Sequence, residues 1–403
     1  MNKIFFAIAI TVSTFSLFSK KIVRMNDASL YEQWSRRPSW FKVSPLSQII
    51  EKNPEIQYQN CFGKVYFDFQ PFGLSHAIPH KGYFKDCFIL EIPDGKVQGQ
   101  EGFVFINNEM IQEMVWADRY EYLLNIPHLS EGEFQKVSGR VAVIAQHAHS
   151  NYCHFFNEVL GRLALLEMHG VEYDWLYVMC HSKFVKDALK LWGVDESKII
   201  HPTTSHFAVQ ADTLILPSLV LNTNNGFWHA GVNAHPNTMK YVKEKLLKNV
   251  QTEIQKDQFS HKILISRRDA PSRNILNEDE IFELLKSKGF ERYDTGKMSV
   301  VEQIALFANA DIVIGEHGAG LTNIMFCKEG TKVVEIFQKL IDVSFWFPSQ
   351  IFNLNYTPVN TLNLNADYFA NWRRIDPTFY LKAMNSRIIV PLDKIKRIVD
   401  SFE

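Results

Sequence analysis

The feature that most constrains the fold is a regular alternation, from Arg140 onward, of short apolar runs with longer amphipathic stretches. Short runs rich in Val and Ile are typical of strands buried on both faces, and the amphipathic stretches between them are typical of helices. Strands that alternate with helices fold into parallel layers, so the sequence predicts the α/β class. The predicted strands are 141–144, 175–179, 213–217, 262–265, 291–293, 311–314 and 332–336, and the predicted helices are 151–169, 183–191, 239–250, 278–288, 300–310 and one that begins near Leu321.

The alternation is divided into two blocks, which predicts two lobes. A Lys-rich helix at 239–250 and a polar segment at 255–260 separate the blocks. We expect two Rossmann-like lobes with a central cleft, because open α/β sheets bind ligands at the carboxyl ends of their strands. The predicted boundaries are an N-terminal lobe over 25–255 with an irregular extension at 25–139, a C-terminal lobe over 256–380 and a C-terminal tail helix over 381–403.

Residues 1–24 are predicted to be a signal peptide or a short membrane anchor. The apolar run at 4–18 is shorter than the ~20 residues that span a bilayer comfortably. Basic residues within 20–24 favour a cytoplasmic location for that flank, whereas a cleaved leader would direct export. The chain is therefore expected to be membrane-associated or exported through this segment, and the side of the membrane stays open.

Charge and cysteine content exclude several classes of protein. The formal net charge is −1, so the chain has no overall positive field that would hold a nucleic acid. The five cysteines are odd in number and form no C-x-x-C pair, which argues against a disulfide framework or a zinc knuckle. Any anion site must therefore be local.

The predicted helix 151–169 places four polar side chains on one face. At ~100° per residue, Asn151, His154, Glu158 and Arg162 share a narrow arc. Because the helix follows a strand, its first turn lies at the carboxyl edge of the sheet, where ligands bind. The alternative is a structural one, in which Glu158 and Arg162 form an i,i+4 pair on a solvated face.

Two segments of the second block are suited to binding phosphate. Arg267 and Arg273 lie in a loop directly after a strand, where guanidinium groups can grip phosphate oxygens bidentately. The turn 315–321 is rich in glycine and precedes a helix, so its backbone can approach a ligand whose negative charge faces free N–H groups. A solvated basic loop and a turn without ligand are the alternatives.

Other chemistries lack their residues. The chain contains no G-x-S-x-G nucleophile elbow and no H-E-x-x-H helix, and the spacing of His147, His149 and His154 is not a zinc pattern. The acidic group 278–280 is better explained as a helix start in which Asn277 and Glu280 form a capping box. No cofactor is required by the sequence, and a divalent metal is possible but not indicated.

Taken together, the three motifs resemble glycosyltransferase family 61, which has bacterial capsule-type and eukaryotic O-linked GlcNAc transferase members. The N-x-x-H-x-x-x-E-x-x-x-R helix, the S-R-R loop and the G-E-H-G-A-G-L turn occur in the family's order over about 140–340. The resemblance implies a GT-B-like pair of lobes and a nucleotide-sugar donor, usually UDP-linked. It also implies inverting transfer to a hydroxyl of a glycan or glycoprotein acceptor in polysaccharide biosynthesis or protein glycosylation.

The resemblance also assigns roles to residues of this chain. Glu335 would bond the ribose hydroxyls, and Asn151 and Arg162 would face the cleft from the acceptor-side lobe. The catalytic base would be Glu158, with His154 as its rival. Glu316 departs from the small residue or proline often found there, which puts a donor contact at that position in doubt. The residues placed at the donor diphosphate are Arg267, Arg273, His317, Gly318, Ala319, Gly320 and Leu321.

The competing hypothesis is a catalytically inactive carbohydrate-binding or scaffold protein of the same fold. Such a protein would be expected to have lost polar residues at the cleft positions. Every position that aligns with the family motifs is filled in this chain. The sequence therefore favours a glycosyltransferase.

Overall fold

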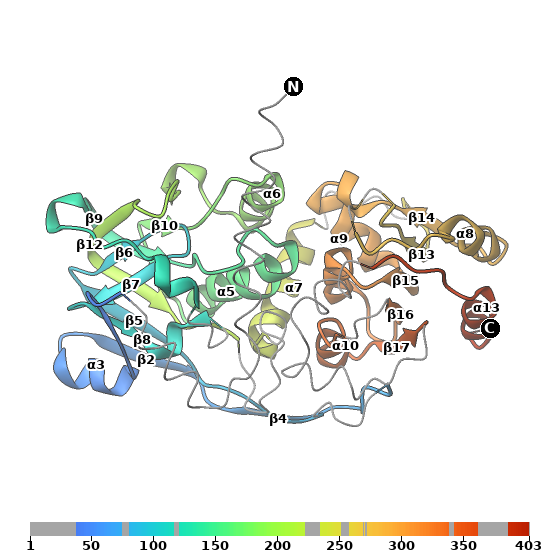
Figure 1. The fold of residues 1–403 in the computed structure, drawn as a ribbon, viewed down its shortest axis with the longest axis horizontal. Helices are drawn as coiled ribbons and strands as arrows, with labels where there is room; N and C mark the ends of the chain where they lie inside the picture. Colours follow the sequence, from blue (N-terminus) through green and yellow to red (C-terminus); the bar gives the residue numbers. More distant parts are fainter. Residues whose placement is uncertain are drawn as a thin grey trace.

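The structure is a computed structural model that describes residues 38–74, 80–116, 121–221, 234–250, 258–268, 270, 272–337, 342–361 and 386–402. Two α/β units lie side by side along the long axis of the molecule (Figure 1). The blue-to-green first half of the chain builds one unit, and the orange-to-red second half builds the other. The expected α/β class with two layered lobes is what the described residues form.

The first lobe is built on a mixed ten-stranded sheet whose centre is parallel. Its parallel strands follow the order β11-β10-β9-β12, in which the first strand along the chain lies inside, as in doubly wound α/β folds. The runs predicted at 141–144, 175–179 and 213–217 all lie in or at the ends of these strands. The four strands are β9 (Gln135–Val143), β10 (Trp175–Tyr177), β11 (Ile199–Ile200) and β12 (Ala208–Pro217).

The region expected to be irregular, 25–139, contributes strands to the same sheet where it is described, and all of their pairings are antiparallel except that of β1 with β8. β5 and β6 pair with β12, and the remaining strands continue outward from them. This region is therefore an extension of the first lobe. The strands are β1 (Lys42–Ser44), β2 (Gln57–Phe62), β5 (Cys87–Pro93), β6 (Lys96–Gln98), β7 (Phe103–Ile106) and β8 (Glu109–Ile111), and α3 (Leu46–Lys52) packs on β8.

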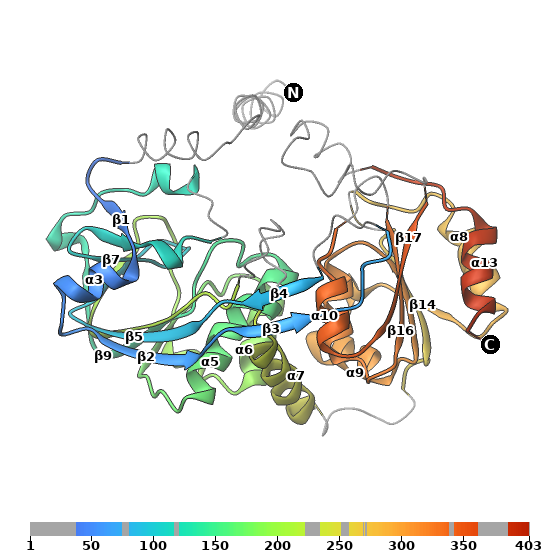
Figure 2. The same cartoon turned by 90° about the horizontal axis from the view of Figure 1, so that it is seen from below.

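One hairpin of this region leaves the first lobe. Strands β3 (Val65–Asp68) and β4 (Lys81–Phe84) form a separate two-stranded sheet that reaches the second lobe beside α10 (Trp346–Ile351) (Figure 2). The rings of Phe67 and Phe69 pack edge-on against Phe347, with centroids 5.6 and 5.5 Å away. The hairpin therefore joins the two lobes through aromatic contacts.

The second lobe is built on a five-stranded sheet that is parallel throughout, in the order β14-β13-β15-β16-β17. This 2-1-3-4-5 order is one of the two common doubly wound arrangements. Helices cover both faces, which is why the central strands β13, β15 and β16 are rich in Ile, Val and Leu. The elements are β13 (Lys262–Ile265), β14 (Glu291–Tyr293), β15 (Ile312–Glu316), β16 (Lys332–Phe337), β17 (Asn355–Asn360), α8 (Glu278–Lys286), α9 (Val300–Asn309), the 3-10 helix η8 (Ala319–Phe326) and α13 (Leu392–Asp400).

The C-terminal helix is part of the second lobe's core. α13 packs beside α8, and its Ile395 and Val399 belong to the same apolar cluster as Ile281 of α8 and Ile314 of β15. A helix was predicted in the tail 381–403, and the observed helix closes one face of the sheet. Removing it would expose that face to water.

The predicted capping box at the start of α8 does not form. The Asn277 side chain makes no cap hydrogen bond and instead exchanges two bonds of 2.9 Å with the backbone of Val390. A capping box forms at α9, where Ser299 and Glu302 exchange side-chain and backbone hydrogen bonds. The Asn277 side-chain amide cannot cap α8, because both its N–H and its oxygen bond to the backbone of Val390, in the segment that leads to α13.

The helix predicted at 151–169 consists of three segments. α4 (Tyr152–His154) is followed by a π-helical turn, η5 (Phe155–Val159), and then by α5 (Leu160–Met168). A π turn contains more residues per turn than an α-helix, so the ~100° spacing is not maintained through it. The arrangement of polar side chains along this helix must therefore be taken from the structure.

The lobes share one apolar cluster that extends through α7 (Pro236–Val250). This helix contacts α5 and α6 (Lys183–Trp192) of the first lobe and α9 and η8 of the second. Its Lys243 donates 2.6 Å to the backbone oxygen of Cys327. The lobes are thus packed together on this side of the molecule.

Within the described residues, no helix combines the length and apolarity that crossing a membrane would require. The predicted leader or anchor, 1–24, lies outside the described residues.

Candidate functional site

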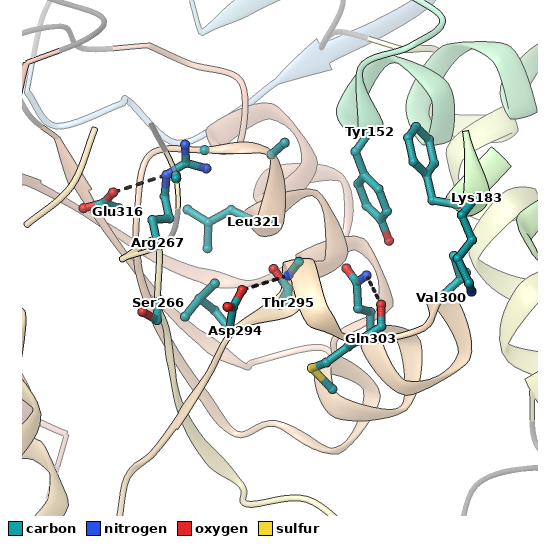
Figure 3. A pocket seen from close by; sticks show the side chains of 18 of the residues that line it. Tyr152, Lys183, Ser266, Arg267, Asp294, Thr295, Val300, Gln303, Glu316 and Leu321 are labelled. Carbon is teal, nitrogen blue, oxygen red and sulfur yellow. Dashed lines mark hydrogen bonds and ion pairs between the residues drawn. The ribbon is translucent and has the colours of Figure 1, made fainter. Parts of the chain in front are cut away.

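A pocket of about 480 Å³ lies between the two lobes. Its floor is the carboxyl edge of the second sheet, where β13, β14 and β15 lead into their loops, which is where doubly wound folds bind ligands. Figure 3 shows Tyr152 and Lys183 of the first lobe facing these loops across the pocket. The first lobe contributes Tyr152, Lys183, Phe184 and Asp187 to the lining.

The arginine loop and the glycine turn meet in this pocket. Arg267, Gly318, Ala319, Gly320 and Leu321 all line it, as the sequence predicted for a shared anion site. The guanidinium of Arg267 lies directly over Gly318, because a Cβ added at Gly318 would be only 2.3 Å from Nη1 of the arginine. A glycine is therefore required for this close approach.

The neighbour of this turn, Glu316, also lines the pocket. Its carboxylate is 3.2 Å from Nε of Arg267, and the residue is only 3% exposed (Figure 3). Desolvation raises the pKa of Glu316 to about 8, although the positive charges of Arg267 and Arg273 oppose that shift. At this position the structure places a buried carboxyl group beside Arg267, inside the pocket.

His317 and Glu335 do not line the pocket. Nδ1 of His317 is 2.5 Å from Glu335, whose other oxygen accepts a hydrogen bond from Tyr356, and the imidazole stacks on Phe337. Glu335 is completely buried, and desolvation raises its pKa. In this conformation its carboxylate does not reach a ribose in the pocket, because both oxygens are engaged inside the lobe.

Arg273 is likewise not part of the lining. It has a left-handed backbone, with φ of 59°, and its charge acts on Glu316 from behind the pocket wall. Of the seven residues predicted at the diphosphate, the structure brings Arg267 and the turn residues Gly318 to Leu321 together and leaves Arg273 and His317 outside.

The polar face predicted on the helix after β9 is mostly buried. Glu158 is completely buried and accepts hydrogen bonds from Nε1 of Trp116, at 2.9 Å, and from Gln146, and it pairs with Nδ1 of His154. The His154 side chain keeps 17% of its surface exposed. Of these two candidates for the base, only His154 can be reached by a substrate in this conformation.

Arg162 does not face the cleft, so the structure corrects that expectation. The residue is 1% exposed, and its guanidinium donates to the backbone oxygens of Ala145, at 2.7 Å, and Pro217, at 2.7 and 3.2 Å. Burial lowers the pKa of Arg162 to about 9. The arginine therefore joins the chain segments at the ends of β9 and β12. Among the described residues, Arg162 and Glu158 form neither a hydrogen bond nor an ion pair with each other, so the predicted i,i+4 pair is not formed.

Asn151 has a local role at the start of this helix. Its side-chain oxygen accepts a hydrogen bond of 2.9 Å from the N–H of Cys153, which makes it the N-cap of α4. Such a bond satisfies one of the free N–H groups of the first turn. The exposed position at the edge of the sheet agrees with the prediction, and the amide itself is used for capping.

The sequence analysis missed a buried polar link between the lobes. The Tyr152 hydroxyl donates 2.9 Å to Asn323 of η8, and Asn323 donates 2.9 Å to Gln303 of α9. Asn323 is completely buried. An asparagine inside the apolar run after Leu321 was the available signal, because a buried amide needs partners.

Among the described residues, no group of three or more His, Cys, Asp or Glu side chains is placed to hold a metal ion. His147 and His149 have other partners, since Nδ1 of His147 is 2.7 Å from Glu101 and Nδ1 of His149 is 2.9 Å from the backbone oxygen of Gln146.

Comparison with known proteins identifies similar sequences. Residues 152–334 match the family model described as Glycosyltransferase 61. The chain is 31% identical over 99 residues to the EGF domain-specific O-linked N-acetylglucosamine transferase of Drosophila melanogaster. The aligned segment covers 23% of this chain and 19% of that protein. It is 35% identical over 81 residues to the protein of the same name from Mus musculus, and this aligned segment covers 19% of this chain and 15% of that protein. The match therefore spans less than a fifth of the length of these relatives.

The matched segment contains the three motifs apart from Asn151, and Glu335 also lies one residue outside it. It begins at the pocket residue Tyr152, includes Arg267 and the glycine turn, and ends in β16. The resemblance stated from the three motifs is thereby confirmed. Residues 152–334 of this chain are thus similar to the glycosyltransferase 61 family.

Proposed function

We propose that the protein is a glycosyltransferase that binds a nucleotide-activated sugar between two GT-B-like lobes and transfers the sugar to a hydroxyl group with inversion. The observation that carries this proposal is the pocket between the lobes, in which Arg267 and the glycine turn meet at the carboxyl edge of the second sheet. Its volume of about 480 Å³ is within the usual range for small-molecule sites. The relatives' names support N-acetylglucosamine as the sugar.

The donor would lie with its diphosphate against Arg267 and the backbone of the glycine turn. A guanidinium binds phosphate oxygens bidentately, and the N–H groups at the start of η8 add positive partial charge. Lys183, on the opposite wall, brings a second cation to the same pocket. These groups would stabilise the negative charge that develops on the departing diphosphate.

His154 would act as the base, and Glu158 would orient it. With Nδ1 bonded to the buried carboxylate, the nitrogen that takes the acceptor proton would be Nε2. In a single displacement, the acceptor oxygen bonds to the anomeric carbon while the bond from that carbon to the diphosphate oxygen breaks. The electron pair leaves with the diphosphate, the hydroxyl proton passes to His154, and the configuration inverts. Tyr152, two residues before His154 in α4, lines the pocket.

Calorimetric titration with UDP and UDP-N-acetylglucosamine tests the donor site. We expect binding by the wild type and a loss of at least tenfold in affinity for Arg267→Ala, because the main phosphate ligand is removed. Arg268→Ala is the matched control, since this neighbouring arginine is half exposed, pairs with Asp279 and does not line the pocket.

Equal losses in the two variants would mean that general charge, and not the pocket, attracts the nucleotide. A wild-type protein that binds neither ligand would favour an inactive scaffold of the same fold. Release of N-acetylglucosamine from the nucleotide, measured with and without candidate acceptors, would then test turnover in the wild type.

A further inference from the structure

Glu316 is the unusual group in the donor pocket. It ends β15, is 3% exposed and lines the pocket on the side of Arg267. Nε of Arg267 and the Glu316 carboxylate lie 3.2 Å apart without an aligned hydrogen bond between them, and a hydrogen bond from the backbone of Ile275 partly offsets the desolvation of the carboxylate. Figure 3 shows the carboxylate and the guanidinium side by side at one wall. A carboxyl group, which is negative when ionised, thus lies against the guanidinium that a phosphate would need.

Charged groups face Glu316 from each described element packed around it. Arg267 and Arg273 approach from the loop after β13, and Glu278 approaches from the start of α8. Glu278 is itself held by Ser266, at 2.8 Å, and by Arg292, at 3.5 Å. Because burial raises the pKa of Glu316 to about 8, its carboxyl group is mostly neutral at pH 7 and mostly ionised at pH 9.

Resting on the donor site proposed above, we propose that Glu316 competes with the donor diphosphate for Arg267, so that nucleotide binding is coupled to uptake of a proton by Glu316. The ionised carboxylate neutralises the guanidinium and repels an incoming diphosphate. Both effects are strong because the carboxylate is close to the guanidinium and is buried away from water. Protonation removes both effects. The carboxyl group at this position therefore makes the pocket sensitive to pH.

The sign of the effect follows from proton linkage. Below pH 8 Glu316 already holds its proton, so the affinity for UDP is constant apart from the titration of UDP itself. Above pH 8 binding must draw a proton from solution, so the dissociation constant rises, with a limiting slope of about tenfold per pH unit. The terminal phosphate of UDP titrates near pH ~6, so measurements between about pH 7.5 and 9.5 separate the two titrations.

Titration calorimetry of the wild type tests this coupling without any variant. UDP is titrated at pH 8.5 in two buffers of different ionisation enthalpy, and the difference in heat gives the number of protons taken up. With a pKa of about 8, we expect net uptake of roughly 0.8 proton per UDP at pH 8.5 and only about 0.1 at pH 7. Binding without uptake at pH 8.5 would overturn the role of Glu316 and leave the donor site standing. Absence of UDP binding at every pH would overturn both proposals.

The variant Glu316→Gln assigns the proton to this residue. It should bind UDP with an affinity that no longer depends on pH, and at pH 9 it should bind more tightly than the wild type. Asp279→Asn is the matched control, because Asp279 pairs with the neighbouring Arg268 but is exposed and lies outside the pocket. This control should keep the wild-type pH profile. A wild-type slope in Glu316→Gln, or a flat profile in Asp279→Asn, would contradict the proposal.

Discussion

Each lobe contains a histidine whose Nδ1 bonds to a completely buried carboxylate. In the first lobe the pair is His154 and Glu158, and in the second lobe it is His317 and Glu335. A carboxylate that is enclosed in this way can orient an imidazole through a hydrogen bond, but it cannot touch a substrate. At the scale of single residues, burial therefore changes the role expected of Glu158 from base to positioning residue.

Variants of this pair separate the two roles. His154→Ala should lower the turnover number by about 100-fold or more, because a general base contributes a factor of 10² to 10⁴. Glu158→Gln should also lower the turnover number, since the amide leaves the imidazole without its charged partner. Affinity for UDP should stay within about twofold of the wild type in both variants, because neither residue lines the pocket. Kinetics with a saturating donor measure the first quantity, and calorimetry measures the second.

His154→Gln is the companion variant, because it keeps a polar side chain of similar length without a base. If His154→Ala or His154→Gln retained wild-type turnover, the proton would have to go elsewhere. Equal loss of donor affinity and turnover in Glu158→Gln would indicate a folding defect, which a thermal unfolding midpoint would reveal.

At the scale of elements, two short irregular segments determine the geometry of the site. The π turn η5 changes the spacing between His154 and Arg162, so that Arg162 points into the lobe. The strand-to-helix turn after β15 brings the backbone of Gly318 under Arg267. Both segments lie at the carboxyl edges of the sheets, where doubly wound folds place their ligands.

Gly318→Ala tests the close approach in this turn. The added Cβ would meet Nη1 of Arg267 at 2.3 Å, so the guanidinium must move away from the backbone that should hold the diphosphate. We expect the affinity for UDP to fall by roughly tenfold, because one strong phosphate contact contributes about 1.5–3 kcal/mol. The thermal midpoint should change little, since the end of a flexible side chain can yield.

Gly132→Ala is the control for this substitution, because a Cβ at that position would meet nothing within 4 Å. Its affinity for UDP should equal that of the wild type. Unchanged affinity in Gly318→Ala would mean that the position of Arg267 over the turn is not the one that binds the nucleotide.

At the scale of the whole molecule, the two lobes are joined on one side by α7 and on another by the aromatic hairpin β3–β4 (Figure 2). Phe72, just after β3, is 2% exposed and lies between Trp346, Phe337 and Tyr356 of the second lobe. Tyr356 in turn bonds to Glu335. The segment from the first lobe therefore supports the layer of side chains around His317.

Phe72→Ala should destabilise the contact between the lobes. Removing a buried phenyl ring costs about 3–5 kcal/mol in free energy of unfolding, and here the loss falls on an interface between two sheets. We expect a lower denaturation midpoint and unfolding in two separate steps, monitored by tryptophan fluorescence and circular dichroism. Tyr66→Ala is the control on the same hairpin, because Tyr66 is 75% exposed. Similar unfolding curves for the two variants would show that the hairpin does not hold the lobes together.

The sequence by itself determined the layered α/β architecture and the segments that form one wall of the pocket. Runs such as 262–265 and 311–314 can form little other than buried parallel strands, because they are apolar without alternation and are separated by helices. Arg267 and the glycine turn were found because both follow such strands directly, and the carboxyl ends of neighbouring parallel strands must lie together.

Only the tertiary structure decided which polar groups are accessible. Trp116, Gln146 and His154 enclose Glu158, and backbone oxygens from two segments enclose Arg162. These partners lie up to 55 positions away along the chain, and a helical period carries no information about them. The hydrogen bonds that satisfy a buried charge are formed across elements, so their geometry depends on how the sheets, the π turn and the hairpin pack, and not on the local order of residues.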